Sequence, residues 1–206
     1  MIHTTILPLN APDWLKTALR TVEDGGLVAF PTDTVYGLGG LAFQAKAVEA
    51  LFQVKGRDTA KAIAVLVGES GALSKVTAQM GEMAERLAER FWPGPLTLVV
   101  ARHPQLPQNI SPTPTIGVRM PDHPAALTLL RAAGPLAVTS ANLSGAANTT
   151  TAQEVYDQLA GRIPLILDGG RTPGGVPSTV VDCTGEQPII LRQGPISLEQ
   201  LLSALT

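Results

Sequence analysis

The fold is decided by the stretch LVAFPTDTVYGLG, residues 27–39. Its first four residues form a continuous apolar run that Pro31 ends, which predicts a short buried strand running into a polar turn over residues 32–34. Before this strand, apolar residues recur at helical spacing from Trp14 to Val22, and Gly25-Gly26 supplies a C-terminal stop. A helix followed directly by a buried strand is a unit from which α/β proteins are built.

The same unit recurs along the chain. Helical periods predict helices over residues 45–54, 80–91, 125–133, 152–159 and 198–205, and apolar runs predict strands over residues 63–67, 96–101, 116–119, 136–139, 165–167, 179–183 and 189–191. The last two runs are joined by residues 184–188 only, a length typical of a hairpin between antiparallel strands. The sequence therefore predicts an α/β fold in which helices flank a twisted mixed sheet.

The composition excludes several classes of protein. Hydrophobic residues make up 45% of the 206 residues and charged residues 16%, which excludes an intrinsically disordered chain. The formal net charge of −2 lacks the basic surplus of a domain that holds nucleic acid by counterion release. Cys183 is the only cysteine, so an intrachain disulfide is excluded. Its apolar neighbours in the sequence favour a small buried side chain. Without a signal-peptide pattern or an apolar run of about 20 residues, we expect a cytoplasmic protein that does not enter a membrane.

Polar and basic residues gather where the predicted strands begin or end. Hydroxyl-bearing segments lie at residues 32–34, 139–142 and 177–179. Five cations lie beside strand termini: Lys55, Arg57, Lys61, Arg119 and Arg192. Because ligands of open α/β sheets bind at strand ends, the joint placement predicts a pocket for a multiply charged anion. Each segment alone also fits an ordinary turn or a solvated surface arginine.

The common catalytic and nucleotide-binding signatures are missing from the sequence. No Gly-Lys dipeptide occurs, so there is no Walker A sequence, and no Gly-x-Gly-x-x-Gly turn follows a strand. The three histidines lack metal-ligand spacing, and Ser140 lacks an identified base. Three aspartates near strand ends either hold a cation or cap turns: Asp33, Asp168 and Asp182.

Taken together, the segments resemble the YrdC-like family. The resemblance is carried by residues 31–39, Lys55-x-Arg57, Thr139-Ser140-Ala141-Asn142-Leu143-Ser144-Gly145, Pro177-Ser178-Thr179-Val180 and Leu191-Arg192-Gln193-Gly194, and it runs from about Thr17 to Gly194. It implies the family's twisted mixed sheet with a basic cavity at the strand ends. It also implies that residues 1–206 form one YrdC-like domain, the short form of the family.

The resemblance further implies a threonylcarbamoyl-adenylate synthase. Such an enzyme joins L-threonine, bicarbonate and ATP into threonylcarbamoyl-AMP and pyrophosphate, and a downstream transferase complex then uses the adenylate to modify tRNA. We expect Mg²⁺ to arrive with ATP, because the sequence contains no dedicated carboxylate cage.

The same resemblance assigns roles to individual residues. Lys55 and Arg57 are the implied catalytic cations, which neutralise carboxylate and phosphate groups. The implied threonine-binding residues are Thr34, Arg119, Thr139 and Ser178. The implied ATP-binding residues are Arg57, Lys61, Thr115, Ser140, Ala141, Asn142, Thr149 and Arg192.

Two alternatives from other functional classes stay open. One is a module that binds double-stranded RNA, a property also linked with the basic cavity of this family. The balanced charge and the eight aromatic residues argue against a stacking platform, although duplex binding by shape needs few aromatics. The other is an accessory domain for carbamoyl transfer, of the kind found in hydrogenase-maturation proteins beside acylphosphatase and zinc modules.

Overall fold

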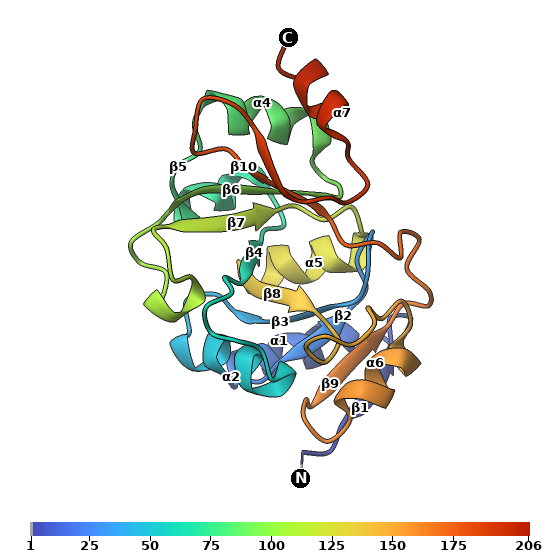
Figure 1. The fold of residues 1–206 in the computed structure, drawn as a ribbon. Helices are drawn as coiled ribbons and strands as arrows, with labels where there is room; N and C mark the ends of the chain where they lie inside the picture. The colour runs from blue at the N-terminus through green and yellow to red at the C-terminus, as the bar shows by residue number, and fades with distance from the viewer. Residues whose placement is uncertain (1) are drawn as a thin grey trace.

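The computed structural model describes residues 2–206, which form a mixed α/β structure around one twisted sheet (Figure 1). The strand order is β1-β9-β2-β3-β8-β4-β7-β6-β10-β11, and β5 pairs with β6. The eleven strands within these residues are β1 (Thr5–Pro8), β2 (Val28–Phe30), β3 (Gly37–Leu41), β4 (Ala64–Leu66), β5 (Thr77–Gln79), β6 (Leu96–Arg102), β7 (Thr115–Arg119), β8 (Leu136–Ser140), β9 (Leu165–Asp168), β10 (Thr179–Asp182) and β11 (Ile189–Arg192).

Helices connect the strands and flank the sheet. They are α1 (Trp14–Glu23), α2 (Ala45–Lys55), α3 (Leu73–Val76), α4 (Glu82–Phe91), α5 (Pro124–Ala133), α6 (Ala152–Leu159) and α7 (Leu198–Ser203), with short 3-10 helices η1 (Ser70–Ala72) and η2 (Gln108–Ile110). In Figure 1, α6 lies with β1 and β9 at the end of the molecule that holds the N-terminus, and α4 lies with α7 at the other end. Arg86 of α4 donates a hydrogen bond of 2.9 Å to the carbonyl oxygen of Leu205, which fastens the segment after α7 to α4.

The sheet is mixed, as predicted. Strand β9 pairs in parallel with both β1 and β2, and β4 pairs in parallel with β7. Strand β3 is antiparallel to both β2 and β8. The predicted hairpin at the end of the chain is confirmed, because β10 and β11 pair in antiparallel orientation. The prediction of a twisted mixed sheet flanked by helices is therefore confirmed.

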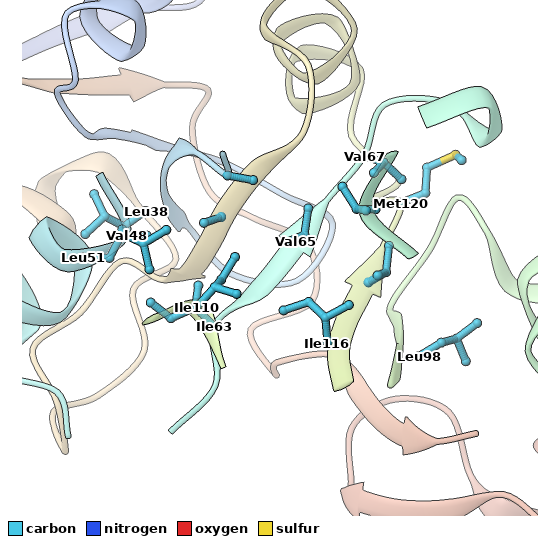
Figure 2. Packing of buried hydrophobic residues seen from close by; sticks show 14 of the residues in the cluster. Leu38, Val48, Leu51, Ile63, Val65, Val67, Leu98, Ile110, Ile116 and Met120 are labelled. Atoms are coloured by element: carbon cyan, nitrogen blue, oxygen red, sulfur yellow. The ribbon is translucent and has the colours of Figure 1, made fainter. Parts of the chain in front are cut away.

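Alternation along the central strands separates the hydrophobic core from the opposite face. Side chains at successive positions of a strand point to opposite faces. Ile63, Val65 and Val67 are almost completely buried in the larger core cluster, and Figure 2 shows Val65 between the group around Leu38 and the group around Ile116. Helices α2, α4 and α6 contribute buried side chains to this cluster. Helices α1 and α5 cover part of the opposite face in a second cluster, which includes Leu66.

A glycine-rich strand, β3, follows shortly after the predicted polar turn. Residues 37–39, for which the sequence predicted no strand, form the beginning of β3. A Cβ on Gly37 would lie 2.9 Å from Cγ1 of Val138, and a Cβ on Gly40 would lie 2.8 Å from a methyl of Leu27. Glycine is therefore required here by the close approach of neighbouring side chains, whereas sequence-based rules associate it with turns.

Sequence periodicity missed three short elements. Strands β1 and β5 contain no run of three consecutive apolar residues, and helix α3 is too short to show a helical period. The proline-rich stretch over residues 103–114 contains only the short helix η2, and Asn109 donates a hydrogen bond of 2.9 Å to the carbonyl oxygen of Ala45 in α2. That stretch therefore packs against the fold and connects two strands of the same sheet.

Candidate functional site

A cavity of about 330 Å³ lies on the face of the sheet opposite the larger core cluster. It crosses the middle strands, and side chains from the loops before β3 and β10 close its rim. Within residues 2–206, its lining contains three arginines and no acidic side chain. The lining residues are Thr32, Thr34, Val35, Tyr36, Gly37, Arg57, Ala62, Ile63, Ala64, Leu66, Thr97, Val99, Gly117, Arg119, Val138, Thr139, Ser140, Pro177, Ser178, Val180, Leu191 and Arg192.

The floor of the cavity is made of the alternate positions of strands β4 and β7. Ala64 and Gly117 line the cavity, whereas Val65 and Val118 point into the core. A Cβ on Gly117 would lie 3.0 Å from Cγ2 of Thr97 and would extend into this floor. Small residues at the centre of the floor therefore leave the volume that larger strand residues would fill.

Arg119, at the end of β7, is a buried arginine with an ion pair. Its Nη2 lies 2.5 Å from Oδ1 of Asp33, and the side chains of the two residues are only 7% and 11% exposed. Its Nε donates to the carbonyl oxygen of Gly94 and its Nη1 to Oγ1 of Thr34, both at 3.0 Å. Burial lowers the pKa of Arg119, and the charge of Asp33 opposes that shift. A guanidinium has five N–H groups, so two remain after these three hydrogen bonds.

Asp33 is itself held in place from a second side. Its Oδ1 also accepts a hydrogen bond of 3.1 Å from the backbone N–H of Asp122, which follows β7. Thr32 completes the network, because its hydroxyl lies 2.9 Å from that of Thr34 and donates to the carbonyl oxygen of Val35 at 2.7 Å. The turn after β2 therefore fixes the head group of Arg119 in one orientation. Asp33 was predicted to cap a turn or hold a cation, and here its carboxylate pairs with a guanidinium.

Arg192 lies at the end of β11 and contacts Ser178 in the segment before β10. Its Nε and Nη2 both donate to the carbonyl oxygen of Ser178, at 3.1 and 2.8 Å, and Nη2 lies 3.1 Å from the hydroxyl of Ser178. That hydroxyl also lies 2.8 Å from the hydroxyl of Thr97 in β6. Burial lowers the pKa of Arg192, and the charge of Arg57 adds to the shift. The sequence analysis did not identify Thr97 as a site residue, because it is the only hydroxyl-bearing residue within the apolar strand β6.

Arg57 carries the least satisfied guanidinium of the three. Its Nη2 donates to the carbonyl oxygen of Ala62 at 3.0 Å, while its Nε is buried and has no hydrogen-bond partner among the described residues. Burial lowers its pKa. A buried N–H without a partner costs free energy, which an anion in the cavity would recover by accepting that hydrogen bond.

Lys55 lies two residues before Arg57 in the sequence, but unlike Arg57 it does not line the cavity. It is the last residue of α2 and is 3% exposed. Its Nζ donates to the carbonyl oxygens of Ser140 and Asn142, the latter at 2.5 Å, and lies 3.3 Å from Oδ1 of Asn142. Burial and then the charge of Arg57 lower the pKa of Lys55 to about 8.

The segment after β8 supplies one wall of the cavity. Thr139 and Ser140 line it directly. Ala141 and Asn142 are buried behind them, and Thr149 is fully buried, with its hydroxyl donating to the carbonyl oxygen of Ala141 at 3.1 Å. The structure therefore brings the whole predicted Thr-Ser-Ala-Asn segment to the cavity, with its first two side chains toward the ligand space and the last two in the supporting wall.

Five of the predicted ATP-binding residues lie outside the cavity lining: Ala141, Asn142 and Thr149 in the wall described above, and Lys61 and Thr115 elsewhere. Lys61 is exposed in the loop between α2 and β4. Thr115 begins β7, and its hydroxyl lies 2.9 Å from that of Thr113. Seven of the other predicted site residues line one cavity: Thr34, Arg57, Arg119, Thr139, Ser140, Ser178 and Arg192.

Residues 2–206 contain neither a cluster of metal-ligating side chains nor a helix that could span a membrane. No group of three or more His, Cys, Asp or Glu side chains in that range is placed to hold a metal ion. None of the helices described there has both the length and the apolar character that crossing a membrane requires.

The chain resembles known proteins over nearly its whole length. Residues 20–194 match the family model Sua5_yciO_yrdC, described as "Telomere recombination". A protein of Bacillus subtilis named threonylcarbamoyl-AMP synthase is 42% identical over 204 residues, which are 96% of this chain and 58% of that protein. The Pyrococcus abyssi Sua5 structure complexed with L-threonine is 38% identical with a TM-score of 0.92, and it matches 100% of this chain and 61% of that one. Escherichia coli YciO is 26% identical with a TM-score of 0.86, over 98% of this chain and 100% of YciO.

The lengths of these proteins differ. The chain spans somewhat more than half of the Bacillus subtilis and Pyrococcus abyssi proteins and the full length of YciO. The match covers the residues from which the YrdC-like resemblance was drawn, so that prediction is confirmed. This chain belongs to the Sua5/YciO/YrdC family.

Proposed function

We propose that this chain is a threonylcarbamoyl-AMP synthase, which forms threonylcarbamoyl-AMP and pyrophosphate from L-threonine, bicarbonate and ATP. The observation that carries the proposal is the arrangement of Arg57, Arg119 and Arg192 around one cavity that has no acidic lining residue among residues 2–206. Threonine carries a carboxylate, ATP and both products carry phosphates, and bicarbonate is itself an anion. The names of the Bacillus subtilis relative and of the threonine complex point to the same chemistry.

The end of the cavity around Arg119 suits the amino acid. The two remaining N–H groups of Arg119 are donors for a carboxylate, and the network with Asp33 and Thr34 holds them in place. The hydroxyls of Thr34, Thr139 and Ser178 lie on the same lining and would contact the polar groups of threonine. Leu66 and Val138 add apolar surface for a methyl group.

The end around Arg57 and Arg192 suits the phosphates. The unpaired Nε of Arg57 is a donor for a phosphate oxygen. Ser140 stands in the wall beside it, and Ala141, Asn142 and Thr149 support that wall. Lys61 and Thr115 do not line the cavity, so we assign them no direct contact with the nucleotide here. Mg²⁺ would enter with the ATP, since residues 2–206 provide no metal cluster of their own.

The reaction needs positioning and charge neutralisation more than covalent catalysis. The ammonium of threonine loses a proton to water, and the neutral amine combines with bicarbonate to give a carbamate and water. A carbamate oxygen then attacks the α-phosphorus of ATP, and the bond from that phosphorus to the bridging oxygen breaks as pyrophosphate leaves. The arginines would hold the two anions against their mutual repulsion and stabilise the charge that develops on the leaving group.

The product defines the reaction that must follow. A carbamoyl group joined to the phosphate of AMP is an activated acyl donor, so it is consumed by transfer to a nucleophile. We propose that the acceptor is an amine of tRNA and that a separate transferase complex carries out that step.

An omission assay tests the proposal. The purified protein is incubated with ATP, Mg²⁺, bicarbonate and L-threonine, each omitted in turn, while pyrophosphate release and the mass of the adenylate are followed. We expect both products only in the complete mixture, their loss in Arg57→Met, and their retention in the matched control Arg90→Met, whose arginine is exposed on α4. Binding of ATP without formation of the adenylate would refute the assignment of threonine as the substrate.

A further inference from the structure

We propose that Lys55 is a positioning residue, whose ammonium binds no substrate and instead holds the turn over residues 140–142 that forms a wall of the cavity. This inference rests on the proposed function for its meaning in catalysis. It departs from the role that the family resemblance implies, in which Lys55 neutralises the charges of the ligands directly.

The first argument is a count of donors. A lysine ammonium has three N–H groups and no acceptor. Three oxygens of the turn receive them, namely the carbonyl oxygens of Ser140 and Asn142 and Oδ1 of Asn142. No N–H group is left for a carboxylate or a phosphate. The side chain is also shut off from the ligand space, because Lys55 is 3% exposed and absent from the cavity lining.

The second argument is the way in which the turn is otherwise held. The backbone N–H of Ala141 donates to the carbonyl oxygen of Tyr36 at 2.8 Å, which ties the turn to the start of β3. The backbone N–H of Ser144 donates to the carbonyl oxygen of Lys55 at 2.9 Å, which ties it to the end of α2. Between these two backbone hydrogen bonds, the ammonium of Lys55 donates to the carbonyl oxygens of both Ser140 and Asn142. Without it, the carbonyl oxygen of Asn142 would lose its donor, and that of Ser140 would keep only the backbone N–H of Asn142, at 3.0 Å, so the turn would loosen and Ser140 would shift on the wall.

The third argument is electrostatic. Burial and the neighbouring charge of Arg57 lower the pKa of Lys55, and three oxygen acceptors around the ammonium favour its charged form. A neutral amine has one N–H fewer than an ammonium, so it cannot serve all three oxygens. The turn should therefore loosen when Lys55 loses its proton.

Hydrogen exchange of the ligand-free protein tests the proposal directly. The amides of residues 141–144 are measured in wild type, in Lys55→Met and in Lys46→Met, a matched control at an exposed position of the same helix. We expect exchange to accelerate about tenfold or more at these amides in Lys55→Met only, with the amides of β7 unchanged. Unchanged exchange at residues 141–144 in a folded Lys55→Met protein would overturn the proposal.

Binding of AMP and ATP separates positioning from direct contact. In calorimetry, a lysine that touches phosphates would make the loss of affinity in Lys55→Met larger for ATP than for AMP. A lysine that acts through the turn lowers both affinities by the same factor, which is the result we expect. A clearly larger loss for ATP would overturn the proposal.

Wild-type protein provides a test that needs no folded variant. Between pH 7 and pH 9.5, exchange at residues 141–144, corrected for intrinsic rates, should accelerate relative to the amides of β7. A constant ratio across this range would count against the proposal. The outcome is independent of the proposed function, which fails separately if wild-type protein makes no adenylate in the omission assay.

Discussion

The three arginines of the cavity differ in how many of their N–H groups already have hydrogen-bond partners within the protein. Arg119 makes three hydrogen bonds within the chain and Arg57 makes one, with a buried Nε left over. A satisfied guanidinium is rigid and selects a ligand by geometry, whereas an unsatisfied one gains more from binding any anion. We therefore expect Arg119 to determine selectivity for the amino acid and Arg57 to contribute more to overall affinity.

The ion pair of Arg119 leads to a prediction for Asp33. In Asp33→Asn, the head group of Arg119 loses its charged partner and its fixed orientation, so the KM for threonine should rise about tenfold, equivalent to about 1.4 kcal/mol. The KM for ATP should stay within about twofold. Steady-state kinetics provide the measurement, and Asp122→Asn is the control because that side chain is exposed. Equal increases for both substrates would contradict the role of Asp33.

Cys183 is predicted to be an unreactive core residue. It is 8% exposed, and burial followed by the charge of Asp182 raises the pKa of its thiol to about 12. In native protein, a disulfide reagent at pH 8 should therefore react slowly, and the rate should rise steeply in denaturant. Cys183→Ala should retain full activity, and a folded but inactive variant would contradict this prediction.

The same thiol contributes to the pH dependence of stability. Because the folded state raises its pKa above the ordinary value of 9.0, the thiol's contribution to stability is complete below about pH 9 and falls as the pH rises toward 12. The difference in stability between wild type and Cys183→Ala should shift over that interval in the direction that disfavours wild type. Urea titrations at pH 8 and pH 10.5 measure it, and a constant difference would show that the thiol does not titrate differently on folding.

At the scale of elements, β3 shows how a strand can depend on missing side chains. It lies between β2 and β8, with Phe30 and Val138 close to its glycines. Glycine costs conformational entropy in a strand, and here that cost is offset by the close packing of the neighbouring strands. This packing also brings Tyr36, just before β3, to the turn after β8 through its hydrogen bond with Ala141.

A methyl group at Gly37 should destabilise the sheet. Its Cβ would lie 2.9 Å from Cγ1 of Val138, and the stiff side chain of valine cannot easily move away. Overpacking of this kind costs about 1–3 kcal/mol, so Gly37→Ala should lower the Tm by roughly 2–10 °C. Gly71→Ala is the control, since a Cβ there would meet nothing closer than 4.0 Å. Equal melting temperatures for the two variants would contradict the packing argument.

At the scale of the whole molecule, the cavity joins distant parts of the chain. It is lined from residue 32 to residue 192, and its walls come from both halves of the sheet. A ligand that binds there contacts several strands and loops that are far apart in the sequence. Binding should therefore stabilise the fold as a whole.

This leads to a prediction for ligand-dependent melting. At about 100 times its Kd, a ligand that binds only the folded state stabilises it by about 2.7 kcal/mol, which corresponds to roughly 5–10 °C in Tm for a chain of this size. Mg·ATP should produce such a shift in wild type and a much smaller one in Arg57→Met. L-Threonine should stabilise more than L-serine, because one methyl group in a pocket contributes about 1–3 kcal/mol. Identical shifts in wild type and Arg57→Met would place the nucleotide elsewhere.

Much of the architecture follows from local pattern. Apolar periodicity located the long helices to within a few residues, for example residues 152–159 for α6, because helix burial repeats along the chain itself. The short hairpin between β10 and β11 was also predictable from its loop length. Strand β3 could not be predicted in this way. Its glycines are required by contacts with Phe30 of β2 and Val138 of β8, and both of these side chains lie on other strands.

The sequence by itself determined the α/β class, the mixed sheet and the family, because these depend on periodicity and on the identity and order of short motifs. Only the tertiary structure decided which way the charged side chains point. Lys55 meets oxygens 85 and 87 residues away, and Asp33 meets a guanidinium 86 residues away. A buried charge turns toward whichever acceptors the fold brings within reach, and neighbours in sequence carry no information about partners at that distance.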